Sequence, residues 1–152
     1  MKTSIIILLL IILVVPVIYL FYLGKKSEAG AAPGLIENQL SRCPGTPNCV
    51  CSEYSEDVEH FIEPVQGSNG LTAKSIAKVV EQLGGQVNSL TDTYVSAIFV
   101  SSWFGFVDDV EFRLDQQTGI MHIRSASREG KSDLGVNRQR VENIKKSLQA
   151  LQ

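Results

Sequence analysis

The sequence has little of what marks the commonest functional classes of protein. It contains only two histidines and one tryptophan, and its 14 basic and 16 acidic side chains leave a net charge of -2. A nucleic-acid-binding protein needs a clustered positive surface, so nucleic acid is not expected as a partner. A nucleophile elbow, a phosphate-binding loop, metal-ligand spacing and internal repeats are all missing. The sequence therefore indicates no catalytic residue, metal or cofactor, and leans away from an enzyme.

Charge is also missing from one long stretch near the N-terminus. Residues 4–23, SIIILLLIILVVPVIYLFYL, are uncharged, and as a helix they would span roughly 30 Å, the thickness of the hydrocarbon core of a bilayer. Pro16 is compatible with such a helix. Tyr19 and Tyr22 lie toward one end of it, where interfacial aromatic residues are common. We therefore expect residues 1–23 to form a single transmembrane anchor.

A cleaved signal peptide is the alternative, because Ala29–Ala31 offers a small-x-small cleavage site. The uncleaved anchor is favoured, since the apolar run is longer than an ordinary signal core and Lys25 and Lys26 separate it from that site. No cysteine directly follows the run, so a bacterial lipoprotein is not expected. Lys2 and the amino terminus balance Lys25 and Lys26, so the lysines leave the orientation open.

Three cysteines lie close together in CPGTPNCVC, where the folded part begins. Their spacing favours a Cys43–Cys49 disulfide with Cys51 free, although spacing alone leaves Cys43–Cys51 open. The rival is a zinc site formed by the three cysteines and His60, but a second Cys-x-x-Cys pair is missing. A disulfide implies an oxidising compartment, so we expect a periplasmic or otherwise extracytoplasmic domain and a cytoplasmic N-terminus.

The remaining chain is predicted to form a linker, residues 24–41, and one α+β domain, residues 42–152. Apolar residues at helical spacing after Thr72 predict a helix that ends near Gly84. Strands are expected over 93–104, 106–115 and 120–127, after a short strand near Phe61 and Ile62. This pattern predicts a small antiparallel sheet of three to four strands packed against two helices, preceded by the transmembrane helix.

The second helix of the domain is expected from about Leu134 to the C-terminus. Its apolar stripe consists of four residues, and Asn137 falls on the centre of the stripe. A polar side chain is thus expected among apolar ones. The stripe residues are Val141, Ile144, Leu148 and Leu151.

The run FGFVDDVEF contains two adjacent acids, Asp108 and Asp109, within a predicted strand, and burying a carboxylate costs free energy. Successive strand residues point to opposite faces, so either Asp108 or Asp109 must face the core. Pairing Asp115 with Ile120 across a four-residue loop aligns the apolar residues of the hairpin on one face. In that register Asp109 lies on a charged face expected to be exposed, and Asp108 lies on the apolar face. The pairs that follow are Phe112 with Ile123, Arg113 with His122, Glu111 with Arg124 and Asp109 with Ala126.

A carboxylate facing the core needs hydrogen bonds or a cation. Ser125 and Ser127 share the face of Asp108, Asn137 points inward from the last helix, and Arg140 lies at the edge of its stripe. We hypothesise that Asp108 pairs with Arg140 or Asn137 and so joins the hairpin to the C-terminal helix.

Three segments, CPGTPNCVCS, FGFVDDVEFRLD and IRSASREGKSDLGVNRQRVENI, resemble the domain of unknown function 1499 family. The resemblance runs from about Cys43 to Leu148. Such domains are often found in bacterial membrane or exported proteins, with plastid relatives, and carry no established reaction. In the family pattern the first two cysteines and Asn48 belong to the motif, whereas Cys51 stands where serine is usual. The resemblance therefore supports a Cys43–Cys49 pair and weakens the zinc interpretation.

The favoured interpretation of the polar motif is architectural, a set of buried or half-buried polar contacts that fixes how segments pack in a structural or interaction module. The alternative is a binding module for an anionic small molecule or an acidic partner, because basic residues cluster around a Gly/Ser loop that enters a helix N-terminus. The motif consists of Asp108, Asp109, Glu111, Arg124, Ser125, Ser127, Arg128, Asn137, Arg138 and Arg140, with Lys131 nearby.

The less favoured alternative is a hydrolytic enzyme that uses Asp108, Asp109 or Glu111 as its acid or base. His60 and His122 are expected at the surface and not as a catalytic pair. A binding or catalytic site requires the motif side chains to surround one accessible pocket, whereas the architectural interpretation requires them to bind one another.

Overall fold

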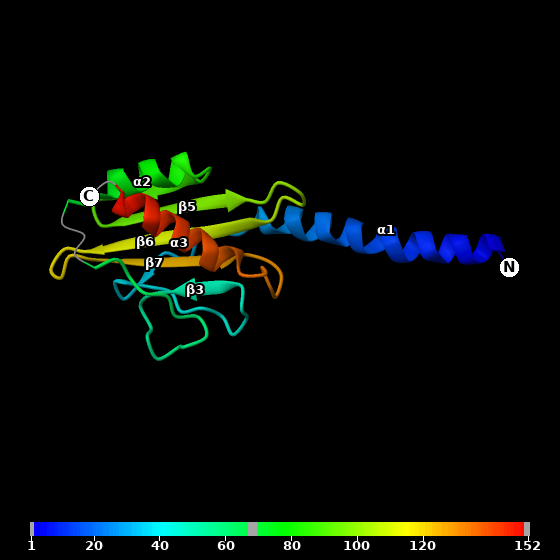
Figure 1. Cartoon of the computed structure of the whole chain (residues 1–152), viewed down its shortest axis with the longest axis horizontal. Coiled ribbons are helices and arrows are strands. Elements are labelled where there is room, and N and C mark those ends of the chain that lie inside the picture. The colour runs from blue at the N-terminus through cyan, green and yellow to red at the C-terminus, as the bar shows by residue number, and fades with distance from the viewer. Residues whose placement is uncertain (1, 67–69, 151–152) are drawn as a thin grey trace.

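The computed structural model describes residues 2–66 and 70–150 and places an antiparallel sheet at the centre of the folded part (Figure 1). A long N-terminal helix projects from one end of the domain. The elements are α1 (Lys2–Ser27), β1 (Leu35–Ile36), β2 (Gln39–Leu40), β3 (Cys49–Cys51), α2 (Ala73–Gln82), β4 (Gln86–Leu90), β5 (Tyr94–Val100), β6 (Val107–Asp115), β7 (Ile120–Ser127) and α3 (Val136–Gln149).

The main sheet has the strand order β3-β7-β6-β5-β4, and all its neighbours are antiparallel. The α+β class is confirmed, but the sheet has five strands where three to four were expected. Two edge strands escaped prediction, because β3 is only three residues long and β4 contains Gln, Asn and Ser without a clear apolar alternation. The strand expected near Phe61 and Ile62 is a single bridge between Phe61 and Cys51.

The predicted register of the β6–β7 hairpin is confirmed. Asp115 pairs with Ile120, and every later pair follows, as far as Asp108 opposite Ser127. The apolar face of this hairpin, with Val110 and Phe112 at its centre, packs under α2 and α3. Matching of apolar faces was therefore enough to place each acid of the motif on the correct side of the sheet.

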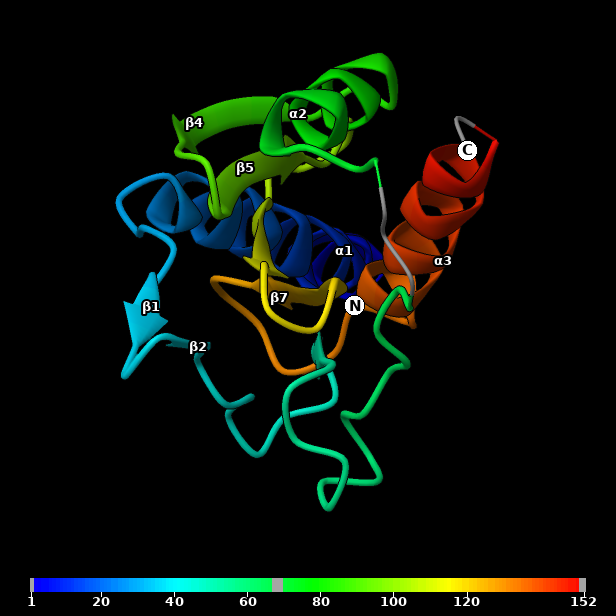
Figure 2. The same ribbon diagram turned by 90° about the vertical axis from the view of Figure 1, so that its left-hand side faces the viewer.

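Helices α2 and α3 cover one face of the sheet and β1 and β2 lie on the other (Figure 2). Thr72 caps α2 through a reciprocal pair of hydrogen bonds with Ser75, as its position predicted. The stripe of α3 is buried at Val141, Ile144 and Leu148, whereas the predicted Leu151 lies outside the described residues. The apolar core thus lies between the helices and the sheet.

The segment predicted as a linker, residues 24–41, packs against the second face of the sheet over part of its length. Leu40 is fully buried, and the Gly34 N–H donates to the Glu111 carboxylate over 2.9 Å. Segment 35–40 forms a small two-stranded sheet, β1 with β2, that contacts β6 and β7. The face that carries the charged residues of the hairpin is consequently covered.

Helix α1 is long and apolar enough to cross a membrane, with a mean hydropathy of 3.2 in its most apolar window. The side chains of residues 3–19 are exposed. A helix of this kind near the N-terminus is compatible with a single-pass anchor or a signal sequence. Its last turns behave differently, because Gly24 and Ser27 are buried against the domain.

Close packing at Gly24 depends on the missing side chain. A Cβ atom at this position would lie 1.8 Å from the Phe104 carbonyl oxygen, so a larger residue would force the helix away from the loop that follows β5. Ser27 completes the contact, since its Oγ accepts a hydrogen bond of 2.9 Å from the backbone N–H of Val107 at the start of β6.

Candidate functional site

The polar motif is divided between the two faces of the sheet and does not form one site. Strand alternation in β6 and β7 sends Asp108, Ser125 and Ser127 toward α3, and sends Asp109, Glu111 and Arg124 to the face covered by the N-terminal segment. The two sets are described below as the helix-side cluster and the covered-face cluster. The helix-side cluster is Asp108, Ser125, Ser127, Asn137, Arg140 and Asn48; the covered-face cluster is Asp109, Glu111, Arg124, Arg128, Arg113, Glu53 and Tyr94.

The helix-side cluster contains the predicted partner of Asp108. Arg140 Nη2 donates to Asp108 Oδ2 over 2.6 Å, and its Nη1 binds Ser125 and Asn137. The guanidinium also lies 4.9 Å from the centroid of the Phe99 ring. Asp108 is only 8% exposed, so a cation in direct contact offsets much of the cost of burying its charge.

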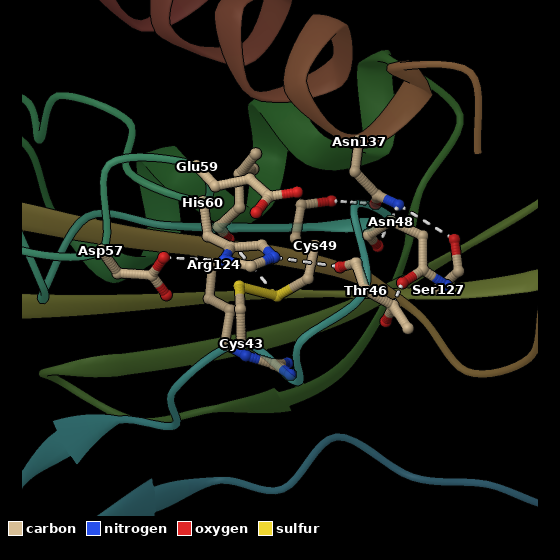
Figure 3. The surroundings of a disulfide bond; sticks show 12 residues. Cys43, Thr46, Asn48, Cys49, Asp57, Glu59, His60, Arg124, Ser127 and Asn137 are labelled. Carbon is tan, nitrogen blue, oxygen red and sulfur yellow. Dashed lines mark hydrogen bonds and ion pairs between the residues drawn. A yellow bond between two sulfur atoms is a disulfide. The ribbon is translucent and has the colours of Figure 1, made fainter. Parts of the chain in front are cut away.

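Asn137 links this cluster to the loop that contains the disulfide (Figure 3). Its Nδ2 donates to the Asn48 carbonyl oxygen over 3.1 Å and to Ser127 Oγ over 3.0 Å. The Asn48 side chain in turn donates to the Gly130 carbonyl oxygen. The disulfide loop, β7, the loop after it and α3 are therefore joined through amide groups that are almost fully buried.

The covered-face cluster differs from the prediction, which expected Glu111 and Arg124 to be exposed. Glu111 is 0% exposed and Arg124 is 6% exposed. Their ion pair measures 3.0 Å, and Glu111 accepts further hydrogen bonds from Tyr94 Oη and the Gly34 N–H. Burial, followed by the contact with Glu111, raises the pKa of the Tyr94 phenol. The expectation was wrong because residues from the N-terminal segment cover this face.

Two further ion pairs lie on either side of Glu111. Arg128 makes a two-pronged contact with Asp109, at 2.9 and 2.8 Å, and donates to the Ser27 carbonyl oxygen at the end of α1. Arg113 binds Glu53 in the same forked manner. The hydrogen bond with Asp109 raises the pKa of Arg128, and that with Glu53 raises the pKa of Arg113. Each acid of the cluster thus has an arginine partner.

The basic residues considered for anion binding do not converge. Arg138 belongs to neither cluster and donates to the carbonyl oxygens of Phe61 and Glu59. Lys131 is exposed on the loop before α3. Arg124 and Arg128 are occupied by Glu111 and Asp109 on the covered face. Proximity in sequence did not produce proximity of the charged groups, because β7 and α3 direct them to different surfaces.

The accessible hollows contain only parts of the motif. A hollow of about 370 Å³ between the end of α1 and the loop before α3 includes Asp108 and Ser127 but none of the motif arginines. Another, of about 500 Å³, includes Arg128 beside the segment 30–34. Neither brings an acid of the motif together with an arginine of the motif, as a catalytic or anion-binding site built from the motif would require.

Cys43 and Cys49 form a disulfide, as the spacing favoured and the family resemblance supported, and Cys51 is a buried free thiol. Burial raises the pKa of Cys51 to about 11, so the nucleophilic thiolate is scarce near neutral pH. The disulfide takes two of the ligands of the alternative zinc site. Within the described residues, no group of three or more His, Cys, Asp or Glu side chains is arranged to hold a metal ion.

The surface position expected for His60 is wrong, since the residue is only 6% exposed. Its Nδ1 contacts Asp57 over 2.8 Å and its Nε2 lies 3.1 Å from the Thr46 carbonyl oxygen, inside the disulfide loop (Figure 3). Both partners accept hydrogen bonds, so the geometry suits the doubly protonated ring. Asp57 chiefly, and then Thr46, raise the pKa of His60.

Because its pKa is raised, protonated His60 is predicted to stabilise the folded state, and this stabilisation disappears at alkaline pH. The imidazolium is favoured in the folded state, so its contribution is complete below the ordinary pKa of about 6.5 and is lost as the pH rises through the folded-state pKa. We expect the difference in Tm between the wild type and His60→Gln to shrink with rising pH, measured by thermal unfolding in buffers from acid to alkaline. Asp57→Asn should reduce this dependence, and a difference that is constant with pH would contradict the prediction.

Sequence reasoning missed three side chains that the two clusters require. Glu53 holds Arg113 and the Leu40 N–H, Asn48 joins the disulfide loop to α3, and Tyr94 binds Glu111. Glu53 and Asn48 lie in irregular segments, where no periodicity signals which way a side chain points. The family motif already contained Asn48, and that was the one available signal.

Comparison with known proteins identifies the folded part. Residues 39–148 match the family described as "Protein of unknown function (DUF1499)". The chain belongs to this family. No curated protein and no solved structure matches the chain. Both polar clusters, except for the contacts made by residues 27–34, lie inside the DUF1499 region, whereas α1 precedes it.

Proposed function

We propose that this DUF1499 protein is a single-pass membrane protein whose extracytoplasmic domain is a structural or interaction module. In this proposal the helix-side and covered-face clusters are an architectural lock, that is, buried polar contacts that hold the hairpin, α3, the disulfide loop and the end of α1 in one arrangement. The observation that carries the proposal is the mutual pairing of the motif, since Asp108, Asp109 and Glu111 each bind an arginine.

The contacts of Ser27 support an uncleaved anchor over a signal peptide. Ser27 is 1% exposed, accepts from the Val107 N–H and offers its carbonyl oxygen to Arg128. Cleavage near Ala29–Ala31 would remove Ser27, and Val107 and Arg128 would lose their contacts with it. The β6 end of the covered-face cluster would then be exposed. A cleaved signal peptide has no reason to fit the mature domain so closely.

The Cys43–Cys49 disulfide supports the extracytoplasmic side, because structural disulfides persist in oxidising compartments. The domain would then lie outside, with the N-terminus of α1 in the cytoplasm. This orientation places Lys25 and Lys26 at the outer end of the helix, where they bind Glu28 and Glu129.

Labelling of an introduced cysteine tests the anchor and the orientation together. Gln117 is exposed in the β6–β7 turn, and the native free thiol of Cys51 is buried. We expect a membrane-impermeant maleimide to label Gln117→Cys on intact spheroplasts, in a membrane-bound product with the mass of the whole chain. The unsubstituted protein gives the background. Labelling only after lysis would show that the domain lies on the cytoplasmic side. A product shorter by about 30 residues would indicate cleavage.

A thermal-shift experiment separates the architectural role from anion binding. We expect inorganic phosphate, citrate and Zn²⁺, each at millimolar concentration, to leave the Tm of the full chain unchanged, since Arg124, Arg128 and Arg140 already bind acids. Lys131→Ala and Arg138→Ala each remove an exposed basic side chain that an anion could bind, and are compared with the wild type. A rise in Tm that phosphate or citrate produces in the wild type and not in these variants would establish a binding module instead.

A further inference from the structure

Two large apolar side chains stand exposed at the end of the domain from which α1 projects. Trp103, in the loop between β5 and β6, is 83% exposed, and Leu134, in the loop between β7 and α3, is 96% exposed. Both loops lie at that end of the domain, beside the helix (Figure 1). A single exposed apolar residue needs no explanation, but two of this size at the same end of a domain indicate a candidate contact surface.

The aromatic loop lies at the level of the last turn of the apolar run. The Phe104 ring packs edge-on against Phe21 with 5.2 Å between ring centroids, and the Phe104 backbone contacts Gly24. Phe21 is two residues before Leu23, the end of the apolar run, and this separation corresponds to about 3 Å along a helix. A bilayer that accommodates the apolar run of α1 therefore reaches this loop, and Trp103 lies next to Phe104.

The second loop approaches the same helical turn from another direction. Lys131 and Val136 line a hollow of about 370 Å³ together with Leu20 and Leu23 of α1. Lys26 binds Glu129 over 2.9 Å and so connects the end of the helix to the start of this loop. The hollow is thus open at the depth where the apolar run ends, and its α1 wall is apolar.

The backbone of Leu134 is also unusual. Its φ of 55° lies in the left-handed region, which costs a non-glycine residue free energy. The conformation directs a leucine side chain out of the domain with almost no protein contact, as its 96% exposure shows. Packing within the domain does not account for that placement, and a lipid environment would favour it.

We propose that the loops 101–106 and 128–135 form a second membrane contact, in which Trp103 and Leu134 insert into the interfacial region of the lipid bilayer around the end of α1. This inference rests on the proposed role of α1 as an uncleaved anchor. Tryptophan is favoured at the depth of the headgroups, where its ring is partly apolar and its N–H remains hydrated. The domain would then be held in one orientation on the membrane surface.

Trp103 can be observed directly, because it is the sole tryptophan of the chain. We expect the full chain, reconstituted into phosphatidylcholine vesicles brominated near the headgroup end of one acyl chain, to show tryptophan emission at least about twofold weaker than in unbrominated vesicles, as an interfacial position predicts. Acrylamide in the aqueous phase should quench this emission weakly.

Two single-tryptophan variants complete the experiment. In the Trp103→Phe background, Leu134→Trp should be quenched by the brominated lipid, and Val58→Trp, at a site 84% exposed in the 54–60 loop, should be quenched by acrylamide alone. If acrylamide quenches Trp103 and Leu134→Trp as strongly as Val58→Trp, and brominated lipid quenches none of the three, the second membrane contact does not exist.

Flotation of the same vesicles separates this outcome from failure of the anchor. A chain that floats with the vesicles after an alkaline wash, yet shows no lipid quenching of Trp103, keeps its anchor and overturns only the second contact. A chain that stays at the bottom of the gradient overturns the anchor, and with it the basis of the inference. Flotation together with lipid quenching supports both.

Discussion

Replacing Glu111 by glutamine is expected to lower the free energy of unfolding by about 3–5 kcal/mol, the range for a buried ion pair that loses one partner. Glu111 is 0% exposed, and the side chain of its partner Arg124 is 8% exposed. The guanidinium would remain buried without a counter-charge, and its Nε already makes no hydrogen bond within the described residues. Thermal or urea unfolding of the wild type and the variant measures the difference, which corresponds to a fall in Tm of roughly 10–20 °C.

A matched control comes from an exposed pair of the same chemistry. Arg42 and Glu56 are 2.7 Å apart, with side chains 59% and 64% exposed, so Glu56→Gln should cost less than about 1 kcal/mol. Adding Arg124→Met to Glu111→Gln removes the unpaired cation and should recover much of the loss. Equal costs for Glu111→Gln and Glu56→Gln would show that burial of the covered-face cluster contributes nothing to stability.

Arg140→Met is expected to have the second largest effect, a loss of about 3 kcal/mol. Arg140 is the cation that contacts Asp108, and the same guanidinium binds Ser125 and Asn137. Methionine keeps an apolar stem of similar length beside Phe99, so the loss reports chiefly the unpaired Asp108 carboxylate and the broken hydrogen bonds. Chemical unfolding monitored by circular dichroism provides the measurement.

Two further variants show whether the charge or the shape of Arg140 matters. Arg140→Lys keeps the charge but cannot reach all three partners at once, and an intermediate loss is expected. Asp108→Asn in the Arg140→Met background removes the orphaned charge and should restore part of the stability. If Arg140→Met and Asp108→Asn each leave the Tm unchanged, the helix-side cluster does not hold α3 to the hairpin.

The two substitutions address different parts of the proposed lock. Arg140 connects the hairpin to α3, which follows it closely in sequence, whereas Glu111 also binds Gly34 of the N-terminal segment, 77 residues away. A loss of similar size in both would indicate that the domain and the segment after α1 unfold together. The packing of Ser27 under Arg128 would then make the end of the membrane helix part of the same cooperative unit.

Much of the fold followed from local patterns in the sequence. The alternation of apolar residues and the four-residue turn determined the β6–β7 register, because a shift by one residue would have turned every apolar side chain to the wrong face. Helical spacing located α2 and α3, with Asn137 inside the stripe. The same patterns placed Asp108 toward α3 and limited its partners to a few residues, of which Arg140 makes the closest contact.

The tertiary structure decided what covers the other face. Sequence periodicity identified Glu111 and Arg124 as partners across the hairpin, but their burial depends on Gly34 and Leu40, which belong to a segment without regular pattern. Contacts between segments far apart in the chain leave no periodic signal, and for that reason the linker and Glu53 were not expected to take part. The sequence by itself determined which way each acid points and that Asp108 faces the core, and the packing of remote segments decided that the acids on the other face are buried as well.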